Sequence, residues 1–169
     1  MKMTKRIAAI AACAVMTVTS MIGMNASAGY SSTMLEPNGN PVSITMGGVN
    51  YGFQIRSEVR TGTSSSGYAQ ATATTYLYEV NGKSIPKNNL AMQTILYGKS
   101  KKTGQVVMID GSYDILSNPN SSSSVYATVS RTDYENQYSS FAASGWARMR
   151  PTTYDDWTYV NGTDTSFIS

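Results

Sequence analysis

The stretch Val49–Thr61 reads VNYGFQIRSEVRT, and its pattern decides the fold class. One set of alternate positions is apolar or aromatic: Val49, Tyr51, Phe53, Ile55 and Val59. The set between them is mostly polar: Asn50, Gly52, Gln54, Arg56, Glu58 and Arg60. A repeat of two residues is typical of a β-strand that has one face in the core and the other in water. The stretch therefore predicts a half-buried strand.

Other segments show the same β-favouring composition and are separated by turn residues. They are Val42–Met46, Tyr68–Val80, Leu90–Tyr97, Gln105–Ile109, Ser112–Leu116, Val125–Tyr134, Ser139–Arg150 and Trp157–Val160. No window after residue 28 keeps an apolar helical spacing for three turns. We therefore predict an all-β fold, a single antiparallel β-sandwich or barrel of about seven to nine strands. It forms one domain over residues 29–169.

Turn residues predict how these strands connect. Gly47-Gly48 leads into Val49–Thr61, and GKSKKTG at residues 98–104 forms the tip of a hairpin. The turn at residues 135–137 joins two antiparallel strands, and Asp110-Gly111 separates two short ones. The chain after Asn161-Gly162 is expected to fray.

The N-terminus has the three parts of a secretory signal peptide. Lys2, Lys5 and Arg6 precede the apolar run Ile7–Ile22, and Ala26-Ser27-Ala28 follows as a small-x-small cleavage site. We predict a helical signal peptide over residues 1–28, cleaved after Ala28, and a secreted, extracellular product. The run is short and rich in hydroxyls for a membrane span. Lipidation at Cys13 is the weaker alternative, since only six residues separate Cys13 from the charges and the apolar run continues past it.

Removing this leader makes the chain electrically neutral. The full sequence has 13 Lys and Arg, and three of them lie in the leader. The remaining chain therefore has ten basic residues and ten Asp and Glu. A neutral chain argues against a nucleic-acid partner and against an acidic membrane surface as partner. We also expect no stable membrane insertion of the mature chain. Because no cysteine follows Cys13, the product has no disulfide, which points to a bacterial protein. The remaining 141 residues are enough for one domain without such crosslinks.

The composition excludes several kinds of catalytic site. The chain has no histidine, so Ser-His-Asp triads, Cys-His nucleophiles and histidine–thiolate zinc sites are excluded. No sequence motif calls for a cofactor or a metal. A hydrolase that uses two carboxylates stays open, with Glu58 and Glu79 as candidates. A non-catalytic protein is the favoured interpretation.

Two strands carry small residues on one face. They are Ala69, Ala71 and Ala73 in one strand and Ala143, Gly145 and Ala147 in another. Small side chains let two sheets approach closely, so we place these faces inward. The outward faces then carry aromatic rings and arginines. The candidate ligand-binding residues are Tyr76, Tyr78, Tyr134, Trp146, Arg148, Arg150 and Trp157.

Outward tyrosine and tryptophan combine a large apolar area with a hydrogen-bonding edge. They suit a surface that stacks against sugar rings, and their other role is to stabilise a solvent-facing sheet through cross-strand pairs. Our leading hypothesis is a secreted binding or interaction module at the cell exterior. It recognises a polysaccharide, a cell-envelope polymer or a cell-surface protein. The alternatives are a bacteriocin-like toxin or effector and a carboxylate-based glycan hydrolase.

Overall fold

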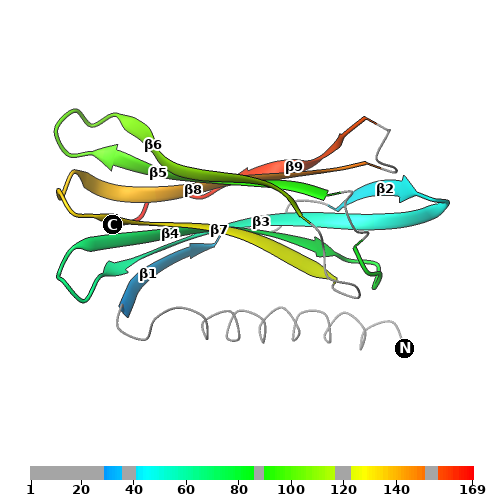
Figure 1. Cartoon of the computed structure of the whole chain (residues 1–169), viewed down its shortest axis with the longest axis horizontal. Helices are drawn as coiled ribbons and strands as arrows, with labels where there is room; N and C mark the ends of the chain where they lie inside the picture. The colour runs from blue at the N-terminus through cyan, green and yellow to red at the C-terminus, as the bar shows by residue number, and fades with distance from the viewer. Residues whose placement is uncertain (1–28, 36–40, 86–89, 117–122, 151–155) are drawn as a thin grey trace.

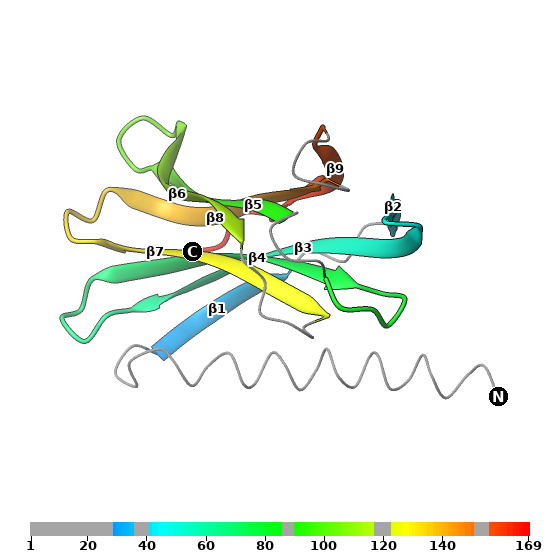
Figure 2. The same ribbon diagram turned by 45° about the vertical axis from the view of Figure 1, so that its right-hand side comes forward.

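The computed structural model describes residues 29–35, 41–85, 90–116, 123–150 and 156–169. These residues form two antiparallel β-sheets stacked face to face (Figure 1). The first sheet consists of β1 (Gly29–Leu35), β3 (Val49–Thr63), β4 (Ala69–Glu79) and β7 (Ser124–Asp133), with β2 (Val42–Met46) also paired to β3. The second sheet has the order β6 (Val106–Leu116), β5 (Leu90–Ser100), β8 (Tyr138–Met149) and β9 (Thr158–Asp164). Figure 2 shows the two layers after a turn of 45°.

The predicted all-β class is confirmed, and so are two of the predicted hairpins. β2 and β3 pair across Gly47 and Gly48, whose φ angles of 56° and 75° need residues without a Cβ. β5 and β6 pair across the lysine-rich turn. The stretch Val49–Thr61 lies within β3, which has β1, β2 and β4 as hydrogen-bonded neighbours. β1 was not predicted from the sequence.

Two connections differ from the prediction. The segment with Asp110-Gly111 is one continuous strand, because the register passes from Leu96 opposite Asp110 to Tyr97 opposite Met108 and leaves Ile109 as a bulge. The turn at residues 135–137 does not close a hairpin. β7 pairs with β4 in the first sheet and β8 pairs with β5 in the second, so this turn crosses between the layers.

The small residues point inward as predicted. Ala71, Ala73, Ala143 and Ala147 are buried, beside Phe53, Ile55 and Val59 from β3. They belong to two separate apolar clusters. One cluster contains Phe53, Leu77, Leu90, Met92 and Met149, and the other contains Val59, Leu96, Val129 and Phe141. The core is therefore divided along the length of the strands.

A band of hydroxyl groups separates the two clusters. Ser57 lies opposite Thr75 in the first sheet, and Thr94 and Thr163 both lie opposite Gly145 in the second. Their hydroxyls bond across the layers. Thr94 Oγ1 donates to the carbonyl of Ala127 at 3.0 Å, and Ser57 Oγ donates to that of Thr163 at 2.9 Å. Buried hydroxyls need such partners, and the small volume of Gly145 lets the sheets come close enough to supply them.

The C-terminal chain is docked, so the prediction that it frays is wrong. β9 continues through Asn161-Gly162 to Asp164. Ile168 and Phe141 then exchange two backbone hydrogen bonds of 2.7 and 2.9 Å. Thr61 Oγ1 donates to the carbonyl of Ser169 at 2.9 Å. Hydrogen bonds to both sheets hold the final residues in place.

The predicted signal peptide over residues 1–28, its cleavage after Ala28 and the alternative at Cys13 lie outside the described residues. Within the described ranges, no helix has the length and apolarity to span a lipid bilayer.

Candidate functional site

The seven candidate residues do not share one surface. Tyr76 and Tyr78 lie on the outer face of the first sheet, because their neighbours Thr75 and Leu77 on β4 point into the core. Trp146, Arg148, Arg150 and Trp157 gather on the outer side of the second sheet, linked by the ring contacts given below. Tyr134 lies beyond the end of β7 and is 69% exposed. The prediction that they point outward holds for the strand residues, but they form three groups.

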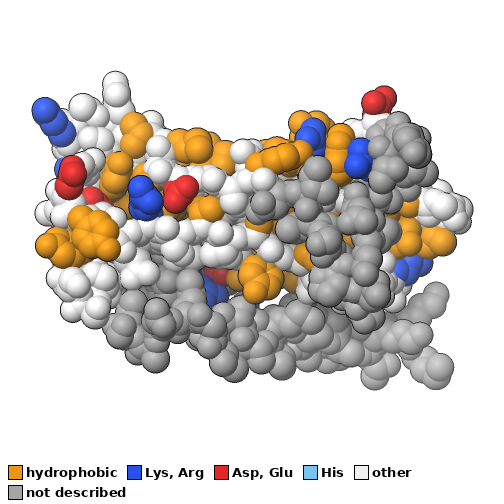
Figure 3. Space-filling view, in the orientation of Figure 1, with side chains coloured by type: hydrophobic (Ala, Val, Ile, Leu, Met, Phe, Trp, Pro, Cys, Tyr) orange, Lys and Arg blue, Asp and Glu red, His pale blue; other side chains and the backbone are white. Residues whose placement is uncertain are grey.

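The largest group is called here the tryptophan face. It consists of Trp146, Arg148, Arg150 and Trp157, of Tyr159 near Trp157 in the sequence, and of two residues that the sequence reasoning did not select, Gln93 and Tyr113. All four strands of the second sheet, or segments next to them, contribute to it. Figure 3 shows hydrophobic and basic side chains along the upper margin of the molecule, over the second sheet.

Trp146 lies at the centre of this face. Its ring centroid is 5.7 Å from that of Tyr113 and also 5.7 Å from that of Tyr159, with interplanar angles of 48° and 60°. Its indole N–H donates to the side-chain oxygen of Gln93, the residue opposite it on β5. Tilted rings at these distances attract each other through edge and face. The three rings therefore form a row in which neighbouring rings are tilted against each other. The central indole is held by both rings and by its hydrogen bond to Gln93.

Two arginines cover the rest of the face. The Arg148 guanidinium lies 5.4 Å from the ring centroids of both Tyr113 and Trp146 and 4.9 Å from that of Trp157. The Arg150 guanidinium lies 4.5 Å from the Trp157 ring. Cation–π attraction at these distances holds Trp157 against the sheet. Tyr113 and Tyr159 remain open to solvent, at 45% and 61% exposure. The face therefore presents aromatic surface, phenol hydroxyls and two positive charges.

No family model, curated protein or solved structure matches the chain. The functional argument therefore rests on the geometry of the chain itself.

The second group is called the tyrosine face and consists of Glu58, Tyr76, Tyr78 and Tyr126. The Tyr76 ring stacks on Tyr78 at 6.1 Å and contacts Tyr126 at 6.2 Å. Its hydroxyl donates to Glu58 at 2.6 Å, while the other Glu58 oxygen accepts from Arg60 Nε at 2.7 Å. Burial, followed by this hydrogen bond, raises the pKa of the Tyr76 phenol well above its usual value. These polar groups are matched to one another, and beside them the buried Nε of Arg56, opposite Tyr76 on β3, has no hydrogen-bond partner among the described residues.

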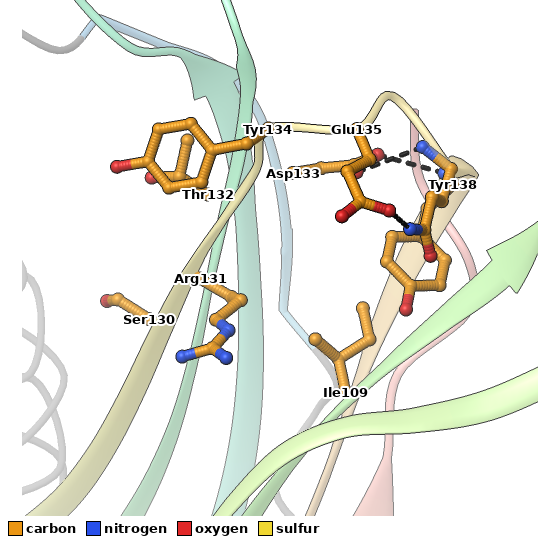
Figure 4. Close-up of a pocket in the computed structure, with 9 residues that line it drawn as sticks. Ile109, Ser130, Arg131, Thr132, Asp133, Tyr134, Glu135 and Tyr138 are labelled. Carbon is orange, nitrogen blue, oxygen red and sulfur yellow. Dashed lines mark hydrogen bonds between the residues drawn. The ribbon is translucent and has the colours of Figure 1, made fainter.

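Tyr134 borders a groove of about 510 Å³ at the turn between β7 and β8 (Figure 4). The Asp133 carboxylate lies in this groove and accepts hydrogen bonds of 2.9 Å from the backbone N–H groups of both Gln137 and Tyr138. Tyr134 packs edge-on against Tyr68 at 5.3 Å. Both oxygens of the buried Asp133 carboxylate thus accept hydrogen bonds from the turn backbone, so we assign Asp133 a structural role.

The proposed carboxylate pair is not brought together. Glu58 points out from the first sheet, whereas Glu79 is buried on the inner side at the end of β4. Glu79 accepts hydrogen bonds from the backbone N–H groups of Gly52 and Asn81, both at 3.0 Å. Both carboxylates are held by partners and face opposite sides of the sheet. The described ranges also contain no group of three or more acidic, histidine or cysteine side chains arranged to hold a metal ion.

Gln93 and Tyr113 were missed for a specific reason. Each lies on a strand that was predicted, but alternation within one strand does not say which other strands are its neighbours. The pairing of β5 with both β6 and β8 brings Tyr113, Gln93 and Trp146 into one row.

Proposed function

We propose that the chain is a secreted, non-catalytic binding module that recognises polysaccharide at the cell exterior through the tryptophan face. The observation that supports it best is the row of Tyr113, Trp146 and Tyr159 on a rigid sheet. Rings fixed by backbone pairing lose little conformational entropy when a ligand stacks on them. Export follows from the leader sequence, which lies outside the described residues.

The physical case rests on what the surface offers a sugar. A sugar ring presents C–H groups on its faces and hydroxyls at its rim. The C–H groups match the aromatic surface, and the hydroxyls match the phenol groups of Tyr113 and Tyr159 and the amide of Gln93. A central anchor that is surrounded by weaker contacts is the usual arrangement of a binding hot spot. Trp146 has that position here.

The experiment is co-sedimentation of the chain from Gly29 onward with insoluble polysaccharides and purified bacterial cell wall. Trp146→Ala is expected to weaken binding by tenfold or more, which corresponds to about 1.4 kcal/mol. Tyr126→Ala is the matched control, because it removes an aromatic ring that is 59% exposed on the opposite sheet. Circular dichroism of both variants checks that they fold.

Two outcomes would count against the proposal. The first is that the unaltered protein sediments with none of these materials. The second is that Tyr126→Ala loses as much binding as Trp146→Ala, because the contact surface would then not be the tryptophan face.

A further inference from the structure

The tryptophan face carries two positive charges that the described part of the chain does not neutralise. Ion pairs within 4.0 Å in that part join Arg60 to Glu58 and Arg131 to Asp110, and neither Arg148 nor Arg150 takes part in one. Asp156 is exposed next to Trp157 but forms no such pair with them. On the outer face of the first sheet, Glu58 pairs with Arg60, whereas Arg56, opposite Tyr76, forms no such pair with the described residues. The tryptophan face has no equivalent acid among the described residues.

Part of the hydrogen-bonding capacity of these guanidiniums has no partner among the described residues. The Nε atoms of Arg148 and Arg150 are both buried and have no hydrogen-bond partner in the described part of the chain. Arg148 donates through one terminal nitrogen to the Tyr113 hydroxyl. A guanidinium has five N–H donors in a planar fork that matches a carboxylate or a phosphate. A ligand does not reach a buried Nε atom, so an anionic ligand accepts hydrogen bonds from the terminal N–H groups of the two guanidiniums.

The positions of the two arginines at the end of β8 indicate a polymeric ligand. They occupy alternate positions of one chain segment, and residues two apart on a strand are about 7 Å apart. The Trp157 ring contacts both of them, with its centroid 4.9 Å from the Arg148 guanidinium and 4.5 Å from the Arg150 guanidinium. Two positive charges therefore lie beside aromatic surface on one chain segment, and an acidic polysaccharide likewise carries several anionic groups beside its sugar rings.

We propose that the ligand of the tryptophan face is an anionic glycan polymer. Its carboxylate or phosphate groups accept hydrogen bonds from Arg148 and Arg150, and its sugar or polyol units pack on Trp146 and Tyr159. This inference rests on the proposed function and narrows it from polysaccharides in general to the negatively charged ones. The charge on the ligand also makes binding sensitive to salt.

The test compares ligands that differ in charge alone. Polygalacturonate is titrated against the chain from Gly29 onward by isothermal calorimetry, and its fully methyl-esterified form provides the same sugar ring without the charge. A poly(glycerol phosphate) arm distinguishes phosphate from carboxylate. The charged polymers are expected to bind at least tenfold more tightly than the ester, and the double variant Arg148→Gln, Arg150→Gln is expected to reduce this ratio to about one.

The control is the double variant Lys101→Gln, Lys102→Gln. It also removes two positive charges, but from the exposed turn between β5 and β6. It is expected to change the affinity for the charged polymers by less than about twofold. Binding of one charged polymer or both, lost in the arginine variant alone, supports the proposal. Equal binding of the ester, or equal loss in the lysine variant, overturns it but leaves polysaccharide binding intact. If none of these polymers binds, this proposal is overturned, and the co-sedimentation experiment decides separately whether the proposed function stands.

Discussion

The two sheets approach each other closely at Gly145, and a methyl group there tests the architecture. A Cβ built on Gly145 would lie 1.9 Å from Thr75 Oγ1, 2.6 Å from its Cγ2 and 2.7 Å from its Cβ. Rotation of Thr75 about χ1 moves the first two atoms but not its Cβ. Relief of the third contact therefore requires the strands β4 and β8 to move apart. Gly145→Ala thus opposes the packing of the two layers directly.

The expected loss of stability follows from two opposing effects. Overpacking of a buried site costs about 1–3 kcal/mol, and we take the upper end because a side-chain rotation does not remove the clash. Replacing glycine by alanine within a strand returns roughly 0.5–1 kcal/mol of backbone entropy. The net destabilisation is then about 2 kcal/mol. For a domain of this size, this corresponds to a fall in Tm of roughly 4–8 °C.

The assay is urea denaturation and differential scanning calorimetry of four proteins: the unaltered chain, Gly145→Ala, Thr75→Gly and the double variant. Thr75→Gly removes the Cβ that blocks the methyl group added at position 145, so the double variant is expected to be more stable than the two single changes predict by addition. The control is Gly111→Ala on the outer face, whose added Cβ meets the end of the exposed Met108 side chain at 3.1 Å. It is expected to leave stability unchanged or to raise it by up to about 1 kcal/mol through the same backbone entropy. A Gly145→Ala protein as stable as the unaltered chain would refute the close approach of the sheets, and so would strict additivity in the double variant.

Three further changes test the contacts around this core. Thr94→Val keeps the shape of the side chain but loses its 3.0 Å hydrogen bond to the carbonyl of Ala127. Urea denaturation is expected to show that the free energy of unfolding falls by about 1 kcal/mol. An unchanged free energy of unfolding would contradict a stabilising role of this hydroxyl. Glu79→Ala leaves the backbone N–H groups of Gly52 and Asn81 without their acceptor; we expect a loss of roughly 2–3 kcal/mol, against almost none for the exposed Glu135→Ala. The raised pKa of Tyr76 means that the folded state keeps its proton above the pH, about 10, at which the unfolded chain loses it. Stability from Tyr76 is therefore fully present below pH 10 and falls above it, and Tyr76→Phe is expected to make the decline shallower by up to about 1.4 kcal/mol per pH unit; identical slopes for both proteins would contradict this.

Alternation along single strands was enough to predict the fold class and the inward small faces. Phe53, Ile55 and Val59 repeat every second residue or nearly so, and a repeat of two has no helical explanation. Ala143, Gly145 and Ala147 were placed inward because only small residues leave room for a facing sheet. The structure agrees, and the clash at Gly145 shows why the size of this residue matters.

The division of the strands between sheets was not predictable in the same way. A two-layer fold has two outer faces, and alternation identifies a residue as outward without saying which layer it belongs to. The sequence therefore left open whether Tyr76 and Trp146 share one surface, and the structure places their strands, β4 and β8, in different sheets. The turn at residues 135–137 was misread for the same reason, since a turn between sheets and a hairpin turn use the same residue types. The bulge at Ile109 and the docked C-terminus depend on contacts between distant segments.

The most direct test of the account uses the two tryptophans of the chain, both of which lie on the tryptophan face. Their indole N–H groups give separate signals in a ¹⁵N-correlated NMR spectrum and report on this surface alone. We expect both signals to shift and saturate during titration with soluble polygalacturonate fragments, while the backbone signal of Tyr126 on the opposite sheet stays unchanged. Binding detected by calorimetry with no movement of either indole signal would contradict the claim that this face is the recognition surface.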